Sequence, residues 1–283
     1  MSLEISTSLS TRLVATDLDG TLVRDDRSIS AYTAETLRRI ADAGVAVVLV
    51  TGRPIRWLHN VYDQLTVRPL AVCANGAVVY EPVGDDIVHA VSLSPATLAE
   101  ACDRLRAVVP SVLFAVERDG GRQMLHERAY PVGPWEMDHS GVRPEPFAVL
   151  TSAPAAKLLV RAGPEGTVDA DEFTALVGTT LAGLAEATNS SSSGVVEVSA
   201  AGVTKASGLA WVAESLGVAA HDVVAFGDMP NDLPMLAWAG RGVAMANGHP
   251  AVLAAAHDVT ARSNEDDGVA AYLESLLFQG LSR

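Results

Sequence analysis

The stretch ATDLDGT, residues 15–21, places two carboxylates one residue apart, directly behind a short apolar run. In an extended chain, residues i and i+2 point to the same side, so Asp17 and Asp19 are predicted to face one space while Leu18 packs away. Gly20 allows a sharp backbone turn. Because Asp-Gly at the end of a strand is ordinarily a turn or a helix cap, this stretch alone leaves both interpretations open.

Two more polar residues end apolar runs elsewhere in the chain. Thr51 closes VAVVLVT, just before Gly52 and Arg53, and Asp228 closes DVVAFGD. In open α/β sheets the carboxyl ends of the strands border the ligand crevice. Three strand ends are therefore predicted to deliver polar groups to the same edge of one sheet.

These residue types suit a metal-assisted phosphoryl transfer. Mg²⁺ prefers a few carboxylates together with waters and phosphate oxygens, and Asp17 and Asp228 are suitable ligands. One carboxylate can attack phosphorus, while a second, Asp19, can protonate the leaving oxygen and later activate water. The hydroxyl of Thr51 and a lysine would hold the oxygens of the transferring phosphoryl group.

The elements that must position these residues alternate along the chain. Short apolar runs predict buried strands, and each is followed or preceded by a helical pattern, with Ser30 as the N-cap and Gly44 as the end of the first helix. The predicted strands are 12–17, 45–51, 69–76, 222–228 and 241–247, and the predicted helices are 31–43, 205–217 and 232–239. This alternation favours an α/β fold with a doubly wound parallel sheet.

The middle of the chain has a different pattern. It predicts a hairpin over 78–92 with a turn at Gly84-Asp85, and beyond it a second α+β domain inserted into the first. We expect a core of residues 1–90 and 189–283 and an inserted domain of residues 91–188. Within the inserted part we predict a helix near 95–108, strands near 112–127, a Pro-rich loop near 131–146, a strand at 157–162, a helix near 170–187 and a loop or hinge at 189–194.

Composition and charge narrow the function classes. The chain has 283 residues, 49% of them hydrophobic, which suffices for one large α/β domain or two smaller ones. The formal net charge of −14 disfavours nucleic acid and anionic membranes as partners. No apolar run approaches the ~18 residues of a membrane helix, and the first residues lack the features of a secretory signal. With Cys73 and Cys102 as the two cysteines, we expect reduced thiols and a cytoplasmic protein.

Four segments together resemble the haloacid dehalogenase-like (HAD) phosphohydrolase superfamily. The segments are DLDGT at 17–21, Thr51 in TGR, Lys205 in GVTKASGL, and GDMPND at 227–232, and they occur in the order of that superfamily's four motifs. TGR, ANGA at 74–77, GVTK and GDMPNDLPML look like its Cof-type branch. The resemblance implies a Rossmann-like core with an inserted α+β cap of the C2 type, and a Mg²⁺-dependent phosphatase that works through an aspartyl-phosphate.

Site roles follow from the resemblance, position by position. Asp17 resembles the nucleophile and a metal ligand, Asp19 the general acid/base with its backbone carbonyl on the metal, and Asp228 a metal ligand. Thr51 and Lys205 resemble the phosphate-binding pair, with Gly52, Arg53 and Asn231 as further phosphate or substrate contacts and Asp232 as a supporting residue.

Several of these residues, and some others, also have a purely structural explanation. From composition alone Lys205 is a solvated residue at a helix start, but its place in the third motif favours the phosphate site. Arg53 is either an exposed residue that caps a helix near Pro54 or a substrate contact. Asn75 before Gly76 is an ordinary turn pair, and the resemblance implies that it also lines the entrance to the site. His126, Tyr130, Trp135 and His139 are each expected in the core or on the surface of the inserted domain, and the acidic run 265–267 in a solvated loop and cap before the last helix.

Three functions remain open at this point. The first is a phosphatase for a small phosphorylated metabolite, with sugar phosphates placed first and phosphates like flavin mononucleotide or pyridoxal phosphate behind them. The second is a sensor that binds a phosphorylated ligand without turnover, because a fold does not fix a function. The third is a phosphomutase or phosphotransferase with the same aspartyl-phosphate. In each case we expect a monomer or a small homo-oligomer.

Overall fold

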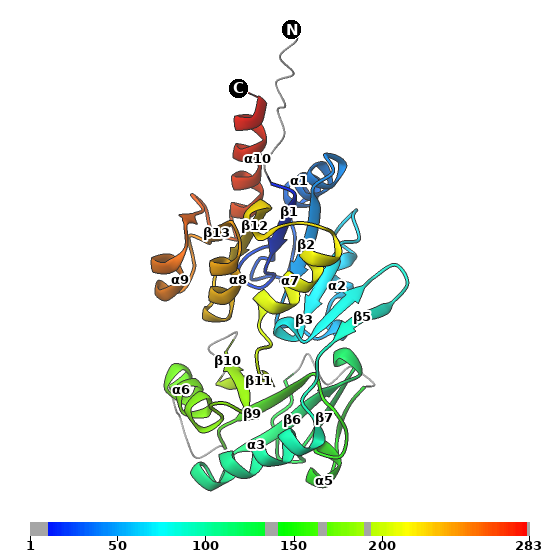
Figure 1. Ribbon diagram of the computed structural model, residues 1–283, viewed down its shortest axis with the longest axis vertical. Helices are drawn as coiled ribbons and strands as arrows, with labels where there is room; N and C mark the ends of the chain where they lie inside the picture. The colour runs from blue at the N-terminus through cyan, green and yellow to red at the C-terminus, as the bar shows by residue number, and fades with distance from the viewer. Residues whose placement is uncertain (1–10, 134–140, 164–168, 190–193, 282–283) are drawn as a thin grey trace. The chain divides into compact units, whose positions relative to one another are not determined.

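A computed structural model describes residues 11–133, 141–163, 169–189 and 194–281. The chain divides into two compact units (Figure 1). The first unit contains residues 1–50, 60–70 and 209–283, and the second contains residues 51–59 and 71–208. These two units divide the chain at positions that differ from the predicted boundaries of the core and the inserted domain, and those boundaries stay a prediction.

Parallel strands form the centre of the first unit. They run in the order β14-β13-β12-β1-β2, and each neighbouring pair is parallel. The central strands are buried along their whole length, as expected for a sheet covered on both faces. The strands are β1 (Leu13–Thr16), β2 (Ala46–Val50), β12 (Val223–Gly227), β13 (Arg241–Ala244) and β14 (Asp258–Val259).

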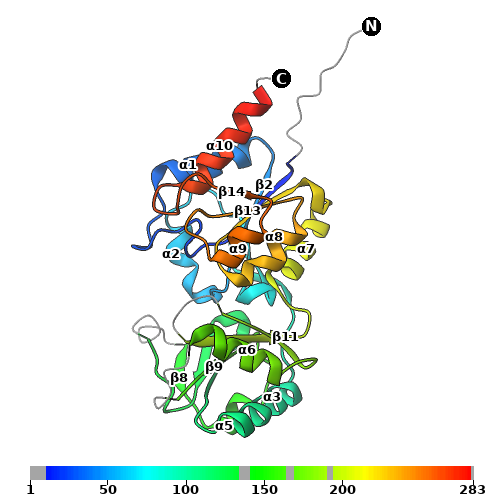
Figure 2. The same cartoon turned by 90° about the vertical axis from the view of Figure 1, so that its left-hand side faces the viewer.

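Helices cover this sheet. The predicted first helix is present as α1 (Ala31–Asp42), and Ser30 caps it by accepting a hydrogen bond from the N–H of Thr33. Figures 1 and 2 show α1 beside α10 (Gly268–Leu281), and α8 (Leu233–Trp238) packs against β12 and β13. The remaining α-helices of this part are α2 (His59–Tyr62), α7 (Lys205–Ser215) and α9 (Pro250–Ala255).

The second unit begins with an antiparallel strand pair that confirms the predicted hairpin. β4 (Val78–Glu81) pairs with β3 (Leu70–Cys73) and with β5 (Asp86–Ala90). The turn between β4 and β5 contains Asp85, whose φ of 57° is the left-handed conformation that turns require.

A six-stranded sheet follows, which we call the cap sheet. Its strand order is β10-β11-β9-β6-β7-β8. The strands are β6 (Leu113–Arg118), β7 (Gln123–His126), β8 (Val142–Pro144), β9 (Lys157–Arg161), β10 (Ala185–Thr188) and β11 (Val195–Ala200). Helices α3 (Pro95–Val108), α5 (Phe147–Leu150) and α6 (Ala170–Thr180) accompany it (Figure 1).

The two faces of the cap sheet differ. One face carries apolar side chains from alternate positions of β6, β9 and β11, and these pack with α3 and α6 into a core that contains Phe114, Leu158, Val198, Leu98 and Phe173. The opposite face carries a smaller apolar group, with Ala115, Met124, Tyr130 and Leu159, together with charged residues. Because successive side chains of a strand point to opposite faces, one face of the cap sheet is apolar and covered by helices, and the other carries both apolar and charged side chains.

Two predictions for the second unit need correction. The predicted helix 170–187 ends at Thr180, and residues 185–188 form strand β10 instead. The predicted Pro-rich loop 131–146 contains β8. Trp135, His139 and residues 190–193 of the predicted hinge lie outside the described residues.

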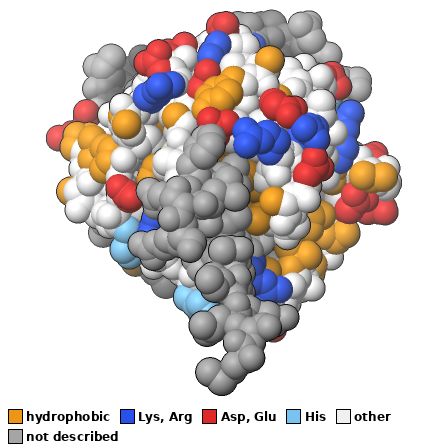
Figure 3. All heavy atoms as spheres, turned by 90° about the horizontal axis from the view of Figure 1, so that it is seen from above, with side chains coloured by type: hydrophobic (Ala, Val, Ile, Leu, Met, Phe, Trp, Pro, Cys, Tyr) orange, Lys and Arg blue, Asp and Glu red, His pale blue; other side chains and the backbone are white. Residues whose placement is uncertain are grey.

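Surface features add two observations. Among the described residues, no helix is long and apolar enough to cross a membrane. On the face in Figure 3, acidic and basic side chains are interspersed among apolar ones. The excess of acidic residues is therefore not gathered into a single acidic surface on that face.

Short 3₁₀ turns complete the chain and carry several residues of interest. They are η1 (Ile55–Trp57), η2 (Ala74–Gly76), η3 (Asp119–Gly121), η4 (Ala220–Asp222) and η5 (Pro230–Asp232).

Candidate active site

A cluster of buried carboxylates lies at the ends of two neighbouring strands of the first unit. Asp17 directly follows β1, and Asp228 directly follows β12. These strands are hydrogen-bonded neighbours, and the N–H of Asp17 donates to the carbonyl of Phe226 at 3.0 Å. Asp232, in η5, completes the cluster, in which one carboxylate oxygen from each residue lies within 4.8 Å of the others.

Hydrogen bonds fix the orientation of this cluster. The hydroxyl of Thr21 donates to Oδ1 of Asp228 at 3.0 Å. Asp232 accepts hydrogen bonds at Oδ2 from the backbone N–H groups of Asp228 and Met229, both at 3.0 Å. Asp232 therefore holds the backbone that carries Asp228, and this arrangement fits the supporting role predicted for it.

The backbone turns sharply after Asp19, whose side chain is exposed. Gly20 has a φ of 76°, and a Cβ atom on it would lie 2.3 Å from Oδ2 of Asp228. The amide of Asn247 donates to the carbonyl of Gly20 at 2.8 Å. A glycine is required here both by the left-handed conformation and by the close approach of the Asp228 carboxylate.

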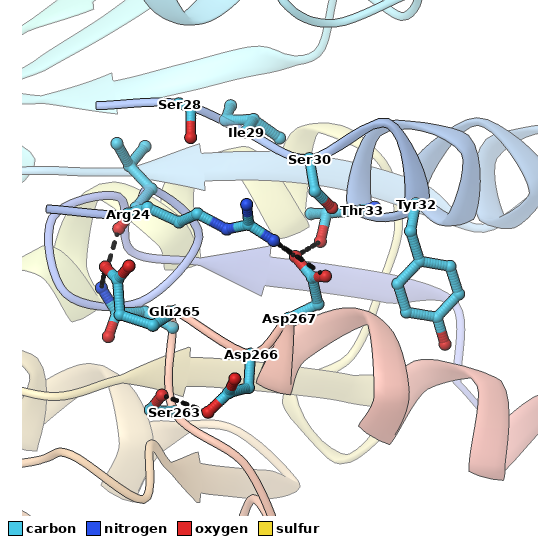
Figure 4. Close-up of polar contacts among 12 residues, drawn as sticks. Arg24, Ser28, Ile29, Ser30, Tyr32, Thr33, Ser263, Glu265, Asp266 and Asp267 are labelled. Carbon is cyan, nitrogen blue, oxygen red and sulfur yellow. Dashed lines mark hydrogen bonds and ion pairs between the residues drawn. The ribbon is translucent and has the colours of Figure 1, made fainter. Parts of the chain in front are cut away.

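Residues near the C-terminal end of the chain anchor the loop that follows this turn (Figure 4). The guanidinium of Arg24 forms an ion pair with Asp267, and both Arg24–Asp267 contacts are 3.0 Å. Asp267 also accepts a hydrogen bond from the hydroxyl of Thr33, and Glu265 accepts one from the N–H of Asp25 at 2.7 Å. The predicted position before the last helix is confirmed for Asp267, but this residue is half-buried and pairs with a residue more than 240 positions away, so it is not simply solvated.

The second unit carries the TGR turn. Thr51 is buried directly after β2, and its N–H donates to the carbonyl of Val72 at 2.7 Å. Its hydroxyl oxygen accepts a hydrogen bond from the N–H of Arg53 at 3.0 Å. The turn at η2 supports it, because Asn75 donates its N–H to the carbonyl of Thr51 at 3.0 Å and Ala74 donates to the carbonyl of Arg53 at 3.1 Å.

Lys205 is the first residue of α7 and is 2% exposed, so the interpretation as a solvated lysine was wrong. The start of this helix packs closely on η2. A Cβ atom on Gly76, whose φ is 104°, would lie 2.0 Å from the carbonyl oxygen of Thr204. Only glycine permits this approach of the two backbones.

The predicted site residues thus fall into two groups. The structure brings Asp17, Asp228 and Asp232 together in the first unit, to which Asp19 and the buried Asn231 also belong. Thr51, Gly52, Arg53 and Lys205 belong to the second unit. The individual roles of these residues stay predictions.

Other residues next to the TGR turn were missed. Lys157 and Glu197 are buried charged residues of the cap sheet, and Lys157 donates to the carbonyl of Gly52. Asn75, which was predicted in a turn and, from the resemblance, at the entrance to the site, donates a hydrogen bond from its side-chain amide to Glu197. Burial raises the pKa of the neighbouring Cys73 to about 12, against the opposing effect of the Lys157 charge, so this thiol stays protonated and is not a nucleophile.

The carboxylate cluster fits a hard divalent cation. Oxygen ligands from a few carboxylates are what Mg²⁺ prefers. Buried carboxylates in contact repel one another, and a bound cation removes that repulsion. The cluster therefore suits the predicted metal, with Asp17 and Asp228 as the carboxylate ligands and Asp232 as the residue that supports Asp228.

Comparisons with known proteins agree with this geometry. The sequence model of the haloacid dehalogenase-like hydrolase family matches residues 14–273. The 5-amino-6-(5-phospho-D-ribitylamino)uracil phosphatase YitU of Bacillus subtilis is 31% identical, with 93% of this chain and 96% of that protein covered. Pyridoxal phosphate phosphatase YbhA of Escherichia coli is 28% identical, with coverage of 95% and 100%.

The fold is also similar to that of a solved structure from the same family. A haloacid dehalogenase-like hydrolase from Bacteroides thetaiotaomicron superposes with a TM-score of 0.74 at 25% identity, with 94% of this chain and 99% of that chain covered. The chain belongs to the haloacid dehalogenase-like hydrolase family. The resemblance read from the four motifs, including the Cof-type branch, is confirmed.

Proposed function

We propose that this chain is a Mg²⁺-dependent phosphatase that hydrolyses phosphate monoesters of small metabolites through an aspartyl-phosphate at Asp17. The observation that carries the proposal is the buried cluster of Asp17, Asp228 and Asp232 at the carboxyl ends of β1 and β12. Membership of a hydrolase family in which similar proteins are phosphatases supports it.

The side chains have separate tasks in this proposal. Asp17 attacks the phosphorus atom with one carboxylate oxygen, and Asp19 donates a proton to the leaving oxygen. Asp19 then accepts a proton from the water that attacks the phosphorus of the aspartyl-phosphate, which regenerates Asp17. Thr51 and Lys205 hold the phosphoryl oxygens and offset their charge.

The metal has a supporting task. Asp17, Asp228 and the backbone carbonyl of Asp19 would hold Mg²⁺, and Asp232 keeps the backbone of Asp228 in place. When bound, the ion neutralises charge, so that an anionic nucleophile can approach an anionic substrate. Such compensation matters in a chain with a net charge of −14.

The substrate belongs to the small phosphorylated metabolites. From the sequence resemblance, we place sugar phosphates first. The names of the relatives add a phosphorylated ribitylaminouracil and pyridoxal phosphate as compounds to include in a substrate panel.

The test is phosphate release from a panel of phosphorylated metabolites, measured with Mg²⁺, with EDTA, and with the Asp17→Asn variant. Because Asp17 is the nucleophile, we expect the substitution to lower release by at least about 10³-fold, and EDTA to abolish it. Circular dichroism of the variant serves as the folding control.

Each outcome has a clear meaning. Full activity of Asp17→Asn on every substrate would contradict the mechanism. No release from any compound, by a folded protein that binds Mg²⁺, would favour a sensor. Transfer of the phosphoryl group to an added sugar in competition with water would favour a phosphotransferase.

The expected cellular location and oligomeric state are inferred from the sequence. We propose that the protein acts in the cytoplasm as a monomer or small homo-oligomer. Sedimentation analysis of the purified chain measures the oligomeric state directly.

A further inference from the structure

Two buried charges on the mixed face of the cap sheet have no part in the mechanism above. Lys157 on β9 is 2% exposed and Glu197 on β11 is 9% exposed. Glu197 lies opposite Leu159, which is two residues along β9 from Lys157, so both side chains are on the same face. Ionised groups are rarely buried unless they are paired, and these two have specific partners.

Lys157 reaches from the cap sheet to the TGR turn. Its ammonium donates to the carbonyl of Gly52 at 2.6 Å and to Oε1 of Glu197 at 2.6 Å. The carbonyl of Gly52 and the N–H of Arg53 belong to one planar peptide unit, so a hold on that carbonyl also orients that N–H. The N–H of Arg53 in turn donates to the hydroxyl oxygen of Thr51 at 3.0 Å.

Glu197 reaches the same turn from the other side. Its second oxygen, Oε2, accepts a hydrogen bond from the side-chain amide of Asn75 at 2.7 Å. Asn75 donates its backbone N–H to the carbonyl of Thr51 at 3.0 Å. The hydrogen bonds therefore close a ring that runs from the TGR turn through Lys157, Glu197 and Asn75 back to Thr51.

We infer that Lys157 and Glu197 are positioning residues of the phosphate subsite: this buried pair, which we call the cap bridge, fixes the Gly52–Arg53 peptide and through it the orientation of the Thr51 hydroxyl. The role of that hydroxyl in binding phosphate rests on the proposed function. The inference that the cap bridge fixes the TGR turn rests only on the hydrogen bonds described above. The cap sheet thus takes part in orienting the Thr51 hydroxyl.

The chain offers a matched control. Arg56 forms a second buried ion pair with Glu117, which lies directly opposite Lys157 in the cap sheet. Arg56 also donates to the carbonyl of Gly121 at 2.7 Å. This pair also joins residues 51–59 to the cap sheet and is similarly buried, but Arg56 holds the carbonyl of Gly121, whereas Lys157 holds that of Gly52.

The experiment compares two double variants. Lys157→Met/Glu197→Gln removes both charges of the cap bridge, so that neither is left buried without its partner. Arg56→Met/Glu117→Gln removes the control pair in the same way. Three quantities are measured for each folded variant: amide hydrogen exchange of residues 51–53, the dissociation constant of inorganic phosphate in the presence of Mg²⁺, and the dissociation constant of Mg²⁺ alone. Thermal unfolding reports the loss of stability in both.

We expect faster exchange at residues 51–53 and a phosphate dissociation constant raised at least about tenfold in the cap-bridge variant, with Mg²⁺ affinity within about twofold of wild type. The control variant is expected to lose thermal stability while keeping the exchange and phosphate affinity of wild type. A purely structural role would lower thermal stability in both variants and leave the phosphate constant unchanged.

The outcomes separate this inference from the proposed function. Unchanged exchange at residues 51–53 in the cap-bridge variant, or an equal loss of phosphate affinity in the control, would overturn the inference. If wild type and Thr51→Ala both fail to bind phosphate, the proposed function falls and with it the phosphate role of the bridge. The exchange data would still decide whether the bridge holds the turn.

Discussion

Gly20 is a residue whose side chain, a single hydrogen atom, decides the geometry of its neighbours. Its φ of 76° and the 2.3 Å between a built Cβ and Oδ2 of Asp228 are two independent reasons for glycine. The first concerns the stability of the turn, and the second concerns the position of a carboxylate in the cluster. A suitable control can separate the two effects.

Gly20→Ala is therefore expected to raise the Mg²⁺ dissociation constant at least about tenfold, because the new methyl group displaces the Asp228 carboxylate. Titration calorimetry with Mg²⁺ measures this constant. The control is Gly44→Ala, where φ is 80° but nothing lies within 4 Å of the built Cβ. Both variants should lose about 1–2 kcal/mol of stability through backbone strain, and only Gly20→Ala should lose metal affinity. Equal Mg²⁺ constants in the two variants would contradict the displacement.

At this scale the sequence indicates some site residues and conceals others. Asp17 and Asp228 were predictable because each directly follows an apolar strand, where a carboxylate is conspicuous. Lys157 and Glu197 were not predictable, because a charged residue inside a strand pattern normally marks the solvent face. Their burial depends on the register of β9 against β11, which pairs residues almost forty positions apart.

Among the elements, α1 shows how a local signal fixes a boundary. Ser30 has an extended backbone, and its side-chain oxygen accepts a hydrogen bond from the N–H of Thr33 at 3.0 Å. Figure 4 shows Ser30 and Thr33 next to the Arg24–Asp267 ion pair. The cap satisfies one of the N–H groups that a helix start leaves without an intrahelical acceptor.

Ser30→Ala is expected to lower the free energy of unfolding by about 1 kcal/mol, because the substitution removes this acceptor. Urea denaturation measures the change. Ser30→Thr keeps a hydroxyl oxygen at the same position and should stay close to wild type. A similar loss in both variants would show that packing, and not capping, is responsible.

The wrongly predicted end of the helix 170–187 shows how strand pairing can override helix propensity. Residues 181–187 are rich in Ala, Leu and Glu, which favour a helix, and the helix was extended through them. In the structure Gly183, with a φ of 76°, follows the end of α6, and Ala185–Thr188 pair with β11 as an edge of the cap sheet. Antiparallel pairing with β11, the next strand along the chain, overrode the helix propensity of these residues. In α7, by contrast, helical periodicity and burial agree, because Leu209, Val212 and Ala213 share one apolar face and are buried, whereas Leu216 lies just beyond the last helical residue and is exposed.

For the whole molecule, two buried thiols give a pH dependence of stability. Burial raises the pKa of Cys73 and of Cys102 to about 12. The thiols of the unfolded chain ionise near their ordinary pKa, so above that pH the unfolded state binds fewer protons than the folded state. The stabilisation is fully present below about pH 9 and is lost as pH rises towards 12.

We expect the two thiols together to cost about 2–3 kcal/mol of stability between pH 7 and pH 10. The comparison is urea denaturation of wild type and of Cys73→Ala/Cys102→Ala at both pH values. The double variant should be less stable at pH 7 because of the lost packing, but its stability should fall less steeply with pH. Burial and the hydrogen bond to Asp85 raise the pKa of Tyr80 to about 12. Tyr80 is present in both proteins, so its contribution to the pH dependence of stability cancels in the comparison. Parallel slopes would refute the assignment.

The anchoring of the loop after Gly20 has a consequence for the protein during its synthesis. Asp17 directly follows β1, near the start of the chain, but Asp228 and Asp232 follow more than 200 residues later, and Asn264 donates to the carbonyl of Val23 across 241 positions. A ribosome that adds about 5–20 residues per second needs roughly 10–50 s to cover that distance. The nascent chain thus carries Asp17 long before it has the other two carboxylates of the cluster. Messenger RNAs truncated within that interval would yield fragments that lack the cluster.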